Sequence, residues 1–334
     1  MPTSPDPRAG AATLGALAEA VLPDGRGLTL RAAAPGDAAG MIDVIHAAFG
    51  ARPLIGARSD ALNETPASLI QALLAGTGYL ALLDGRPAGV VLVSQDGAAL
   101  RLGRVCVHPA FQRLGVASFM VRALLEVMAE RGAAQVTLLA RREYPQLRQF
   151  WESHGFRHVG EEGNYWVLAL PLPVVAQIPD ADAMRALGRS LAPLLRAGDL
   201  VIASGGLGAG KTTLTQGLGE GLGVQGPIIS PTFVLARVHP SLVGGPALVH
   251  ADAYRLGGFA ELEDLDLEES LADAVTVIEW GAGVAEALAP ERLEVAIRRS
   301  LDPADETRWV FLTPRGRWGR GELAAAVASL EEHP

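Results

Sequence analysis

Gly205-Gly206-Leu207-Gly208-Ala209-Gly210-Lys211-Thr212-Thr213 fits the pattern G-x-x-x-x-G-K-[ST] of a phosphate-binding loop. The apolar run 200–203 before the loop predicts a buried strand. Leu214, Leu218 and Leu222 recur after it at helical spacing. This strand–loop–helix order is the context that the pattern requires, because backbone N–H groups and a helix N-terminus then face the phosphate. The stretch therefore predicts an α/β domain with a P-loop NTPase-like fold.

The side chains of the loop indicate a site for a nucleoside triphosphate with Mg²⁺. Lys211 is expected to bridge the terminal phosphates and Thr212 to ligate the magnesium ion. Of the 28 basic residues in the chain, Lys211 is the only lysine, and a planar guanidinium is a poor substitute for a compact ammonium in a phosphate cradle. The residues predicted to bind this nucleotide, which the family resemblance described below implies to be ATP, are Gly206, Leu207, Gly208, Ala209, Gly210, Lys211, Thr212 and Thr213.

Composition limits the protein class. A length of 334 residues predicts two domains at roughly 150 residues each. A net charge of −9 argues against a broad electrostatic grip on nucleic acid, and no apolar run is long enough to predict a membrane span. The single cysteine, Cys106, excludes internal disulfides and favours a cytoplasmic location. Residues 1–27, rich in Pro, Ala and Gly, predict a flexible N-terminal tail with a short helix over 11–22.

A second glycine-containing turn lies in residues 28–172, which form a self-contained pattern of strands and helices. A strand ending at Val107 is followed by a turn and a long apolar helix. The turn places small residues where a helix begins, which suits a pyrophosphate. The turn and the start of the helix read Gln112-Arg113-Leu114-Gly115-Val116-Ala117.

These residues resemble the Q/R-x-x-G-x-G/A loop of the GCN5-related N-acetyltransferase (GNAT) family. The stretch 150–156, which reads F-W-E-S-H-G-F, resembles the F-Y-x-x-x-G-F motif that closes the family's domain. The resemblance implies a mixed α/β sheet domain that binds acetyl-coenzyme A at 112–117. It also implies that the strand around Val105 and Val107 pairs with the pantetheine arm through backbone groups.

The catalytic group of this domain is left open by the sequence. Family members often use the tyrosine of F-Y as the general acid for the departing thiolate, and this position holds Trp151. Tyr144 and Tyr165 are alternative acids. Glu143 and His108 are candidate bases, although His108 also fits an ordinary surface turn. The domain is therefore predicted either to acetylate an amine or to be a non-catalytic module. The amine would be a protein N-terminus, an amino acid or a small amine.

A proline-containing linker at 170–173 separates the two halves, and the second domain is predicted over 173–334. Within it, the stretches 247–256 and 275–280 each predict an apolar strand that ends in an acid, Asp252 in the first and Glu279 in the second. A carboxylate at the tip of a strand beside the phosphate loop can hold magnesium or orient an attacking water. Thr232, in a loop fixed by a proline, is a candidate phosphate sensor.

Four ordered motifs of the second domain resemble the TsaE family, the ATPase of bacterial tRNA threonylcarbamoyladenosine biosynthesis. They are G-x-L-G-A-G-K-T-T at 205–213, S-P-T-F at 230–233, H-x-D-x-Y-R-L at 250–256 and E-W at 279–280. The resemblance implies ATP hydrolysis in support of a TsaD–TsaB complex that modifies adenosine 37 of tRNA, with tRNA contacted only indirectly. It also implies that Thr212 and Glu279 hold magnesium and that Asp252 serves hydrolysis.

Two positions depart from the TsaE pattern. Gly206 stands where the family usually has an acid, which is expected to alter the hydrolysis rate more than nucleotide binding. Met184 stands where the family often has a threonine. The alternative for this domain is a small-molecule kinase, fused to a non-catalytic module that binds coenzyme A or a partner protein. A GTPase is disfavoured because its N-K-x-D motif needs a second lysine.

Overall fold

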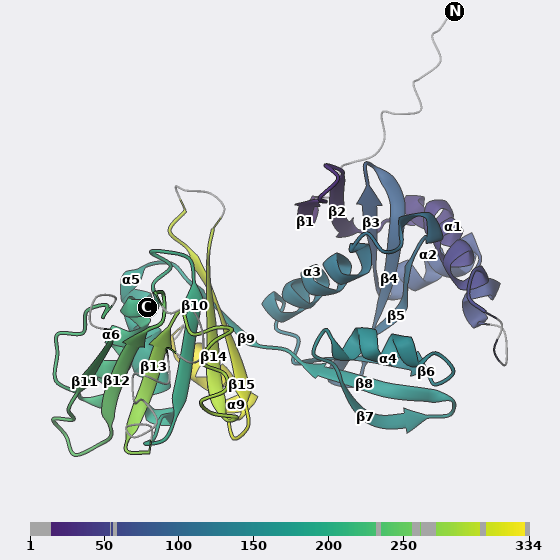
Figure 1. Ribbon diagram of the computed structural model, residues 1–334. Coiled ribbons are helices and arrows are strands. Elements are labelled where there is room, and N and C mark those ends of the chain that lie inside the picture. The colour runs from purple at the N-terminus through teal and green to yellow at the C-terminus, as the bar shows by residue number, and fades with distance from the viewer. Residues whose placement is uncertain are drawn as a thin grey trace, which may run out of the picture. The chain divides into compact units, whose positions relative to one another are not determined.

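The computed structural model describes residues 15–53, 55, 59–231, 235–255, 261, 272–300 and 305–330. The chain divides into two compact units, Met1–Leu172 and Pro173–Pro334 (Figure 1). Both units are α/β, as the sequence predicted, and each has its own sheet. Within the described residues, no helix combines the length and the apolar character needed to cross a membrane.

The N-terminal unit is built on an eight-stranded sheet of order β1-β2-β3-β4-β5-β6-β8-β7, in which only β5 and β6 run parallel. Its strands are β1 (Ala16–Val21), β2 (Gly27–Ala32), β3 (Thr77–Leu83), β4 (Arg86–Asp96), β5 (Ala99–Val107), β6 (Gln135–Arg141), β7 (Arg157–Glu162) and β8 (Tyr165–Pro171). Its helices are α1 (Ala38–Gly50), α2 (Pro66–Ala75), α3 (Val116–Glu130) and α4 (Pro145–Glu152).

Helices cover both faces of this sheet. Val90 of β4 and Cys106 of β5 are buried in one cluster with the apolar side chains of α1 and α2. The neighbouring residue Gly89 lies against Met120 of α3, where a Cβ atom would come within 2.3 Å of the methionine sulfur. Because successive residues of a strand face opposite sides of the sheet, α3 covers the side away from α1 and α2 (Figure 1).

The predicted helix over residues 11–22 is wrong for the part that the structure describes. Ala16–Val21 forms the edge strand β1, antiparallel to β2. Alanine favours helices intrinsically, but the open edge of β2 offers a ladder of backbone partners that a short isolated helix lacks. Residues 1–14 lie outside the described part of the chain.

The C-terminal unit has a seven-stranded sheet of order β11-β12-β13-β10-β14-β15-β9. The four strands from β12 to β14 in this order are parallel, and the strands outside them run antiparallel to their neighbours. The strands are β9 (Val174–Ile178), β10 (Leu200–Gly205), β11 (Ala236–His239), β12 (Ala247–Asp252), β13 (Ala274–Glu279), β14 (Arg292–Arg299) and β15 (Arg308–Arg315). The α-helices among its described residues are α5 (Ala181–Leu191), α6 (Lys211–Leu222) and α9 (Arg320–Ala328).

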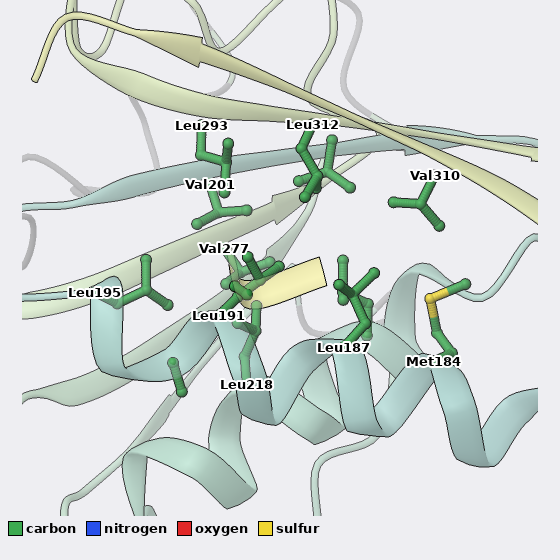
Figure 2. Close-up of a cluster of buried hydrophobic side chains, with 14 of the residues drawn as sticks. Met184, Leu187, Leu191, Leu195, Val201, Leu218, Val277, Leu293, Val310 and Leu312 are labelled. Atoms are coloured by element: carbon green, nitrogen blue, oxygen red, sulfur yellow. The ribbon is translucent and has the colours of Figure 1, made fainter. Parts of the chain in front are cut away.

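One apolar core fixes the helices against this sheet (Figure 2). Leu187 and Leu191 of α5 and Leu218 of α6 lie in the same cluster as the strand residues Val201 and Val277. Figure 2 also labels Met184, Leu195, Leu293, Val310 and Leu312 of this cluster. Burial of each large aliphatic side chain stabilises the fold by roughly 1.5–3 kcal/mol, so this core holds α5 and α6 against the sheet.

Helices α5 and α6 approach closely through glycines. A Cβ atom on Gly217 of α6 would lie 2.1 Å from the carbonyl oxygen of Arg185, and one on Gly188 of α5 would lie 2.5 Å from that of Leu214. Side chains at these positions would push the two helices apart. The close contact therefore holds α6, whose first residue is Lys211, at a fixed place beside the sheet.

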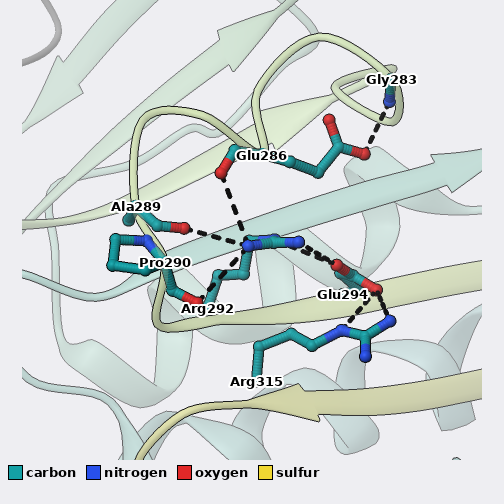
Figure 3. Close-up of polar contacts among 7 residues, drawn as sticks. All are labelled: Gly283, Glu286, Ala289, Pro290, Arg292, Glu294 and Arg315. Atoms are coloured by element: carbon teal, nitrogen blue, oxygen red, sulfur yellow. Dashed lines mark hydrogen bonds and ion pairs between the residues drawn. The ribbon is translucent and has the colours of Figure 1, made fainter. Parts of the chain in front are cut away.

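A polar network secures the chain between β13 and β14 (Figure 3). Arg292 donates to the Glu294 carboxylate at 2.6 Å and to the carbonyl oxygens of Ala289 and Pro290 at 3.1 and 3.4 Å. Arg315, in the neighbouring strand β15, donates to the other oxygen of Glu294 at 3.1 Å. The Glu294 carboxylate thus links β14 to β15 and, through Arg292, to the loop that precedes β14.

Candidate functional site

The parallel strands of the C-terminal sheet bring the loop at 205–213 and two acids to one edge. Strand β13 lies between β10 and β12, and Glu279 at its end is level with Ala203 of β10 and Asp252 of β12. Strand β10 runs directly into the loop, which ends where α6 begins. The carboxyl ends of parallel strands are the usual ligand edge of such sheets.

The carboxylate of Glu279 is the centre of this edge. Its Oε1 atom accepts hydrogen bonds from Thr212 Oγ1 at 2.7 Å and from His250 Nε2 at 2.8 Å. Glu279 is 3% exposed and His250 is fully buried. Because an ionised carboxylate only accepts, His250 carries its proton on Nε2 in this arrangement. Within the described residues, no group bonds to the buried Nδ1 of His250.

Lys211 is held by three groups at the mouth of the loop. Its ammonium donates to the carbonyl oxygens of Gly205 and Gly206 at 2.9 and 3.1 Å. It also lies 3.8 Å from the centroid of the Trp280 ring. Burial lowers the pKa of Lys211, while the Glu279 and Asp252 carboxylates oppose that shift. An anionic phosphate would supply the charge that these neutral partners do not.

Asp252 is fixed by its own set of donors. Ser230 Oγ donates to Oδ2 at 3.2 Å, and the backbone N–H of Tyr254 donates to Oδ1 at 2.9 Å. The Tyr254 ring in turn packs on Trp280, with ring centroids 5.0 Å apart. Trp280 has a left-handed backbone, with φ of 61°, which is uncommon for a bulky residue. The acid and the two aromatic rings therefore form one assembly around Lys211.

The donor set at this edge fits Mg²⁺. Among the described residues, no group of three or more His, Cys, Asp and Glu side chains could hold a metal ion without help. Two carboxylates and a hydroxyl nevertheless converge here, and oxygen ligands completed by phosphate and water are what Mg²⁺ prefers. Thr212 donates its proton to Glu279, so the lone pairs of its oxygen remain available to a cation.

The loop itself has the backbone that its glycines predict. Gly208 and Gly210 have φ of 70° and 110°, in the left-handed region. Met184 of α5 packs beneath the loop, 3.3 Å from where a Cβ on Gly210 would lie. Gly206 is exposed, and a Cβ there would meet nothing within 4 Å. Leu207 is 86% exposed, whereas Ala209 is buried. Thr232 lies outside the described residues.

In the N-terminal unit, the predicted acetyl-coenzyme A turn lies between β5 and α3. Arg113 and Gly115 have φ of 63° and 82°, and Gly115 is the cap residue before Val116, the first residue of α3. Gln112 is exposed, and its side-chain amide donates to the Val107 carbonyl oxygen at 3.1 Å. Leu114 and Ala117 flank the turn, half-buried.

Strand β5 is open on one side where the pantetheine arm is expected. Its pairing with β6 covers only Leu100–Leu102, although β5 continues to Val107. Beyond Leu102 the two parallel strands diverge, so within the described part of the chain no strand pairs with the backbone around Val105 on the β6 side. An extended ligand can add itself to such an edge through backbone hydrogen bonds.

The candidate acids and bases of this unit differ in their surroundings. The Tyr144 hydroxyl donates to the Pro53 carbonyl oxygen at 2.8 Å, and Trp151 is buried against Phe156 with ring centroids 5.1 Å apart. His108 Nδ1 accepts from the N–H of Ala110 at 3.2 Å, as in a turn. Tyr165, at the start of β8, is half-buried.

Glu143 is held in a different way, near the end of β6. It accepts from Asn164 at 2.5 Å and lies 3.5 Å from Arg141. None of these contacts identifies a catalytic acid or base.

Comparison with known proteins identifies both units. Residues 178–308 match the family model described as threonylcarbamoyl adenosine biosynthesis protein TsaE. Over 144 residues the chain is 62% identical to the protein of that name from Streptomyces coelicolor, covering 42% of this chain and 97% of the relative. The chain belongs to the TsaE family. A TsaE protein from Mycobacterium leprae is 52% identical over 121 residues, which is 34% of this chain and 75% of that protein.

The remaining half of this TsaE-family chain is a GNAT domain. Residues 53–156 match the family model described as acetyltransferase (GNAT) family. A solved structure of the PaiA N-acetyltransferase from Thermoplasma acidophilum, in complex with coenzyme A, is 13% identical and covers 43% of this chain and 98% of that chain, with a TM-score of 0.40. The assignment of this domain rests on the family model. The chain is therefore a fusion of the two families that the sequence motifs indicated.

Several residues of the nucleotide edge were missed by sequence reasoning. The sequence motifs include His250, Trp280, Ser230 and Tyr254 but assign them no role. Only the structure shows that His250 bonds to Glu279 and that Trp280 covers Lys211. The signal was present, since all four residues lie within two positions of a predicted functional residue. What the sequence lacked was the direction in which each side chain points.

Proposed function

We propose that the TsaE domain hydrolyses ATP with Mg²⁺ during the biosynthesis of threonylcarbamoyladenosine in tRNA, in the cytoplasm, and acts on a TsaD–TsaB complex. The observation that carries this proposal is the convergence of Lys211, Thr212, Asp252 and Glu279 at one edge of a parallel sheet. Family membership favours this function over the small-molecule kinase, because the TsaE motifs form that edge.

Each residue has a separate task in this proposal. The loop backbone from Gly206 to Thr213 wraps the phosphates, and Lys211 leaves its carbonyl partners to neutralise the terminal ones. Thr212 and Glu279 hold the magnesium ion, which neutralises charge on the phosphates when it is bound. Asp252, kept in place by Ser230 and the Tyr254 backbone, orients the attacking water and takes up its proton.

A genetic experiment tests this function. The full chain, produced in bacterial cells that lack their own TsaE, is expected to restore threonylcarbamoyladenosine in tRNA, measured by mass spectrometry of digested tRNA. Lys211→Ala is expected to abolish the rescue at equal protein level. Absence of rescue by the well-expressed wild-type chain would contradict the proposal.

We further propose that the GNAT domain transfers the acetyl group of acetyl-coenzyme A to an amine. The observation in its favour is the divergence of β5 from β6 next to the turn at 112–117. Positioning a neutral amine beside the thioester can supply much of the rate, so an acid at Trp151 is not required. Calorimetric measurement of acetyl-coenzyme A binding to the full chain tests the first step, which is cofactor binding. Release of free thiol in the presence of amines tests the second step.

A further inference from the structure

Three arginines surround the place where β5 and β6 diverge. Arg104 lies in β5 just beyond the last residue paired with β6, with a left-handed φ of 51°. Arg141 is the last residue of β6, and Arg52 follows the end of α1. Arg104 and Arg52 both come from the α1–α2 side, because Arg104 bonds to Glu64, which precedes α2, and Arg52 packs on Phe49 of α1.

Among the described residues, the three arginines differ in their carboxylate partners. Arg104 donates to Glu64 at 2.9 and 3.0 Å, and Arg141 lies 3.5 Å from Glu143. The guanidinium of Arg52 lies over the Phe49 ring, 4.0 Å from its centroid, and among the described residues it forms no ion pair. Of the three guanidinium groups, Arg52 is thus the one that pairs with no carboxylate of the described residues.

The environment makes this charge costly. Burial lowers the pKa of Arg52, and the nearby Arg141 lowers it further. The groups that oppose the shift are the Cys106 thiol and the Tyr144 hydroxyl, which are neutral acids rather than carboxylates. Burial raises the pKa of Cys106 to about 12, so this residue is an uncharged thiol at neutral pH. A partly buried guanidinium without an anion is the arrangement that an anionic ligand completes.

Arg52 is also held in place by its neighbours. The Tyr144 hydroxyl donates to the carbonyl oxygen of Pro53, the next residue, at 2.8 Å. Tyr144 lies just before α4 and is 5% exposed. This bond fixes the backbone beside Arg52 to the end of β6 and its following turn. A guanidinium fixed in advance loses little conformational entropy when it binds a carboxylate.

The position of the cluster distinguishes it from the expected phosphate site. The turn at 112–117 begins α3, which covers the opposite face of the sheet from α1 and α2. The arginines lie at the open end of β5, where the thioester is expected to meet the acceptor. We propose that Arg52, with Arg104 and Arg141, binds a carboxylate of the acetyl acceptor, which is therefore an amine that also carries a carboxylate. This inference rests on the proposed acetyltransferase function.

Binding measurements on the full chain test the subsite without knowledge of the acceptor. Titration calorimetry with succinate and with its neutral counterpart succinamide is carried out with and without coenzyme A. Succinate is expected to bind at least about tenfold more tightly than succinamide, since the guanidinium recognises the charge. Arg52→Met, which keeps an apolar stem over Phe49, is expected to weaken succinate binding about tenfold and to leave coenzyme A affinity within twofold. Arg157→Met, at an exposed arginine of β7, is the matched control and is expected to change neither.

A second experiment measures acetyl transfer to pairs of amines that differ in whether they carry a carboxylate. Free amino acids, their amides and peptides with an acidic side chain and a blocked C-terminus separate the two sources of a carboxylate. Faster acetylation of either carboxylate-bearing set than of its neutral counterpart supports the proposal. The KM for that acceptor is then expected to rise about tenfold in Arg52→Met and to return toward the wild-type value in Arg52→Lys. Preference for the neutral amines would contradict it.

The outcomes separate the two proposals. Equal binding of succinate and succinamide, or succinate binding that ignores Arg52→Met, overturns the carboxylate subsite. Weaker coenzyme A binding in Arg52→Met would instead assign the arginines to the cofactor and also overturn it. If the wild-type chain does not bind coenzyme A or acetyl-coenzyme A at all, the acetyltransferase function fails, whatever succinate does.

Discussion

Thr212 Oγ1 donates a 2.7 Å hydrogen bond to Glu279 Oε1, across 67 residues of sequence. The bond joins the first turn of α6 to the end of β13, so it links the phosphate loop to the neighbouring strand. A hydrogen bond to a charged group contributes roughly 1.5–3 kcal/mol. The bond therefore holds the threonine hydroxyl and the glutamate carboxylate together at the nucleotide edge.

Removal of either partner is expected to weaken magnesium use more than nucleotide binding. Glu279→Gln keeps the shape of the side chain but removes its negative charge, and Thr212→Val removes the hydroxyl. Both variants should reduce the ATPase rate at least about a hundredfold, the scale of losing one preorganised group, while the affinity for ATP without magnesium changes less than threefold. Thr212→Ser should retain most of the rate. Full activity in Thr212→Val would exclude this threonine as a ligand.

His250 is expected to act by positioning Glu279. It is fully buried and donates to the same oxygen that Thr212 uses. His250→Phe should raise the magnesium concentration for half-maximal rate about tenfold, because Glu279 loses its second donor. His239→Phe is the control, since this other buried histidine bonds to the Gln225 carbonyl oxygen instead. Equal effects of the two substitutions would indicate a general loss of stability.

Gly206→Glu restores the acid that TsaE proteins usually have at this loop position. The residue is exposed and a Cβ there meets no atom within 4 Å, so the substitution should fold without strain. We expect the ATPase rate to change at least about threefold, while the dissociation constant for a nucleotide changes less than twofold. Thermal unfolding checks the fold, and stopped-flow ATPase measurements check the rate. An unchanged rate would show that this position does not tune hydrolysis.

The buried Cys106 thiol is expected to make the free energy of unfolding fall at alkaline pH. Burial raises its pKa from 9.0 to about 12. Because the folded pKa lies above the unfolded one, this contribution is complete below pH 9 and is lost as the pH rises toward 12. At pH 10 the loss is about 1.4 kcal/mol. It is measured as the difference in unfolding free energy between pH 8 and pH 10, which should be smaller in Cys106→Ala. Rapid alkylation of the native thiol by iodoacetamide at pH 8 would contradict the burial.

The ion pair of Arg317 with Asp199 should stabilise the C-terminal domain. Asp199 is 6% exposed and accepts from Arg317 Nε at 3.0 Å. Arg317→Met leaves this acid without its cation and should lower the free energy of unfolding by about 3 kcal/mol. Arg315→Met, at a more exposed arginine paired with Glu294, should cost less than about 1 kcal/mol. Denaturant unfolding of the full chain measures both, with the C-terminal transition identified by its shift on addition of ATP.

Sequence alone identified the two families and most of the elements around their motifs. The loop at 205–213 is local, since its spacing of glycines with Lys211 and Thr212 fixes the backbone and the chemistry within nine residues. Asp180 is a second local signal, because an aspartate just before a helix is a typical cap, and its side chain accepts from the Ala183 N–H. Such local patterns are encoded by neighbouring residues, so they can be read without a structure.

Tertiary structure alone decided which distant side chains meet. The sequence placed Asp252 and Glu279 at strand ends, but the strand order brings β13 between β10 and β12 and makes Glu279 the partner of both Thr212 and His250. The edge strand at Ala16–Val21 was mistaken for a helix because its stability comes from pairing with β2 rather than from its own residues. The arginines at 52, 104 and 141 carry no motif, and they form a cluster only because β5 and β6 diverge beside the end of α1. Spacing along the chain cannot encode these contacts, because each depends on packing between segments far apart in sequence.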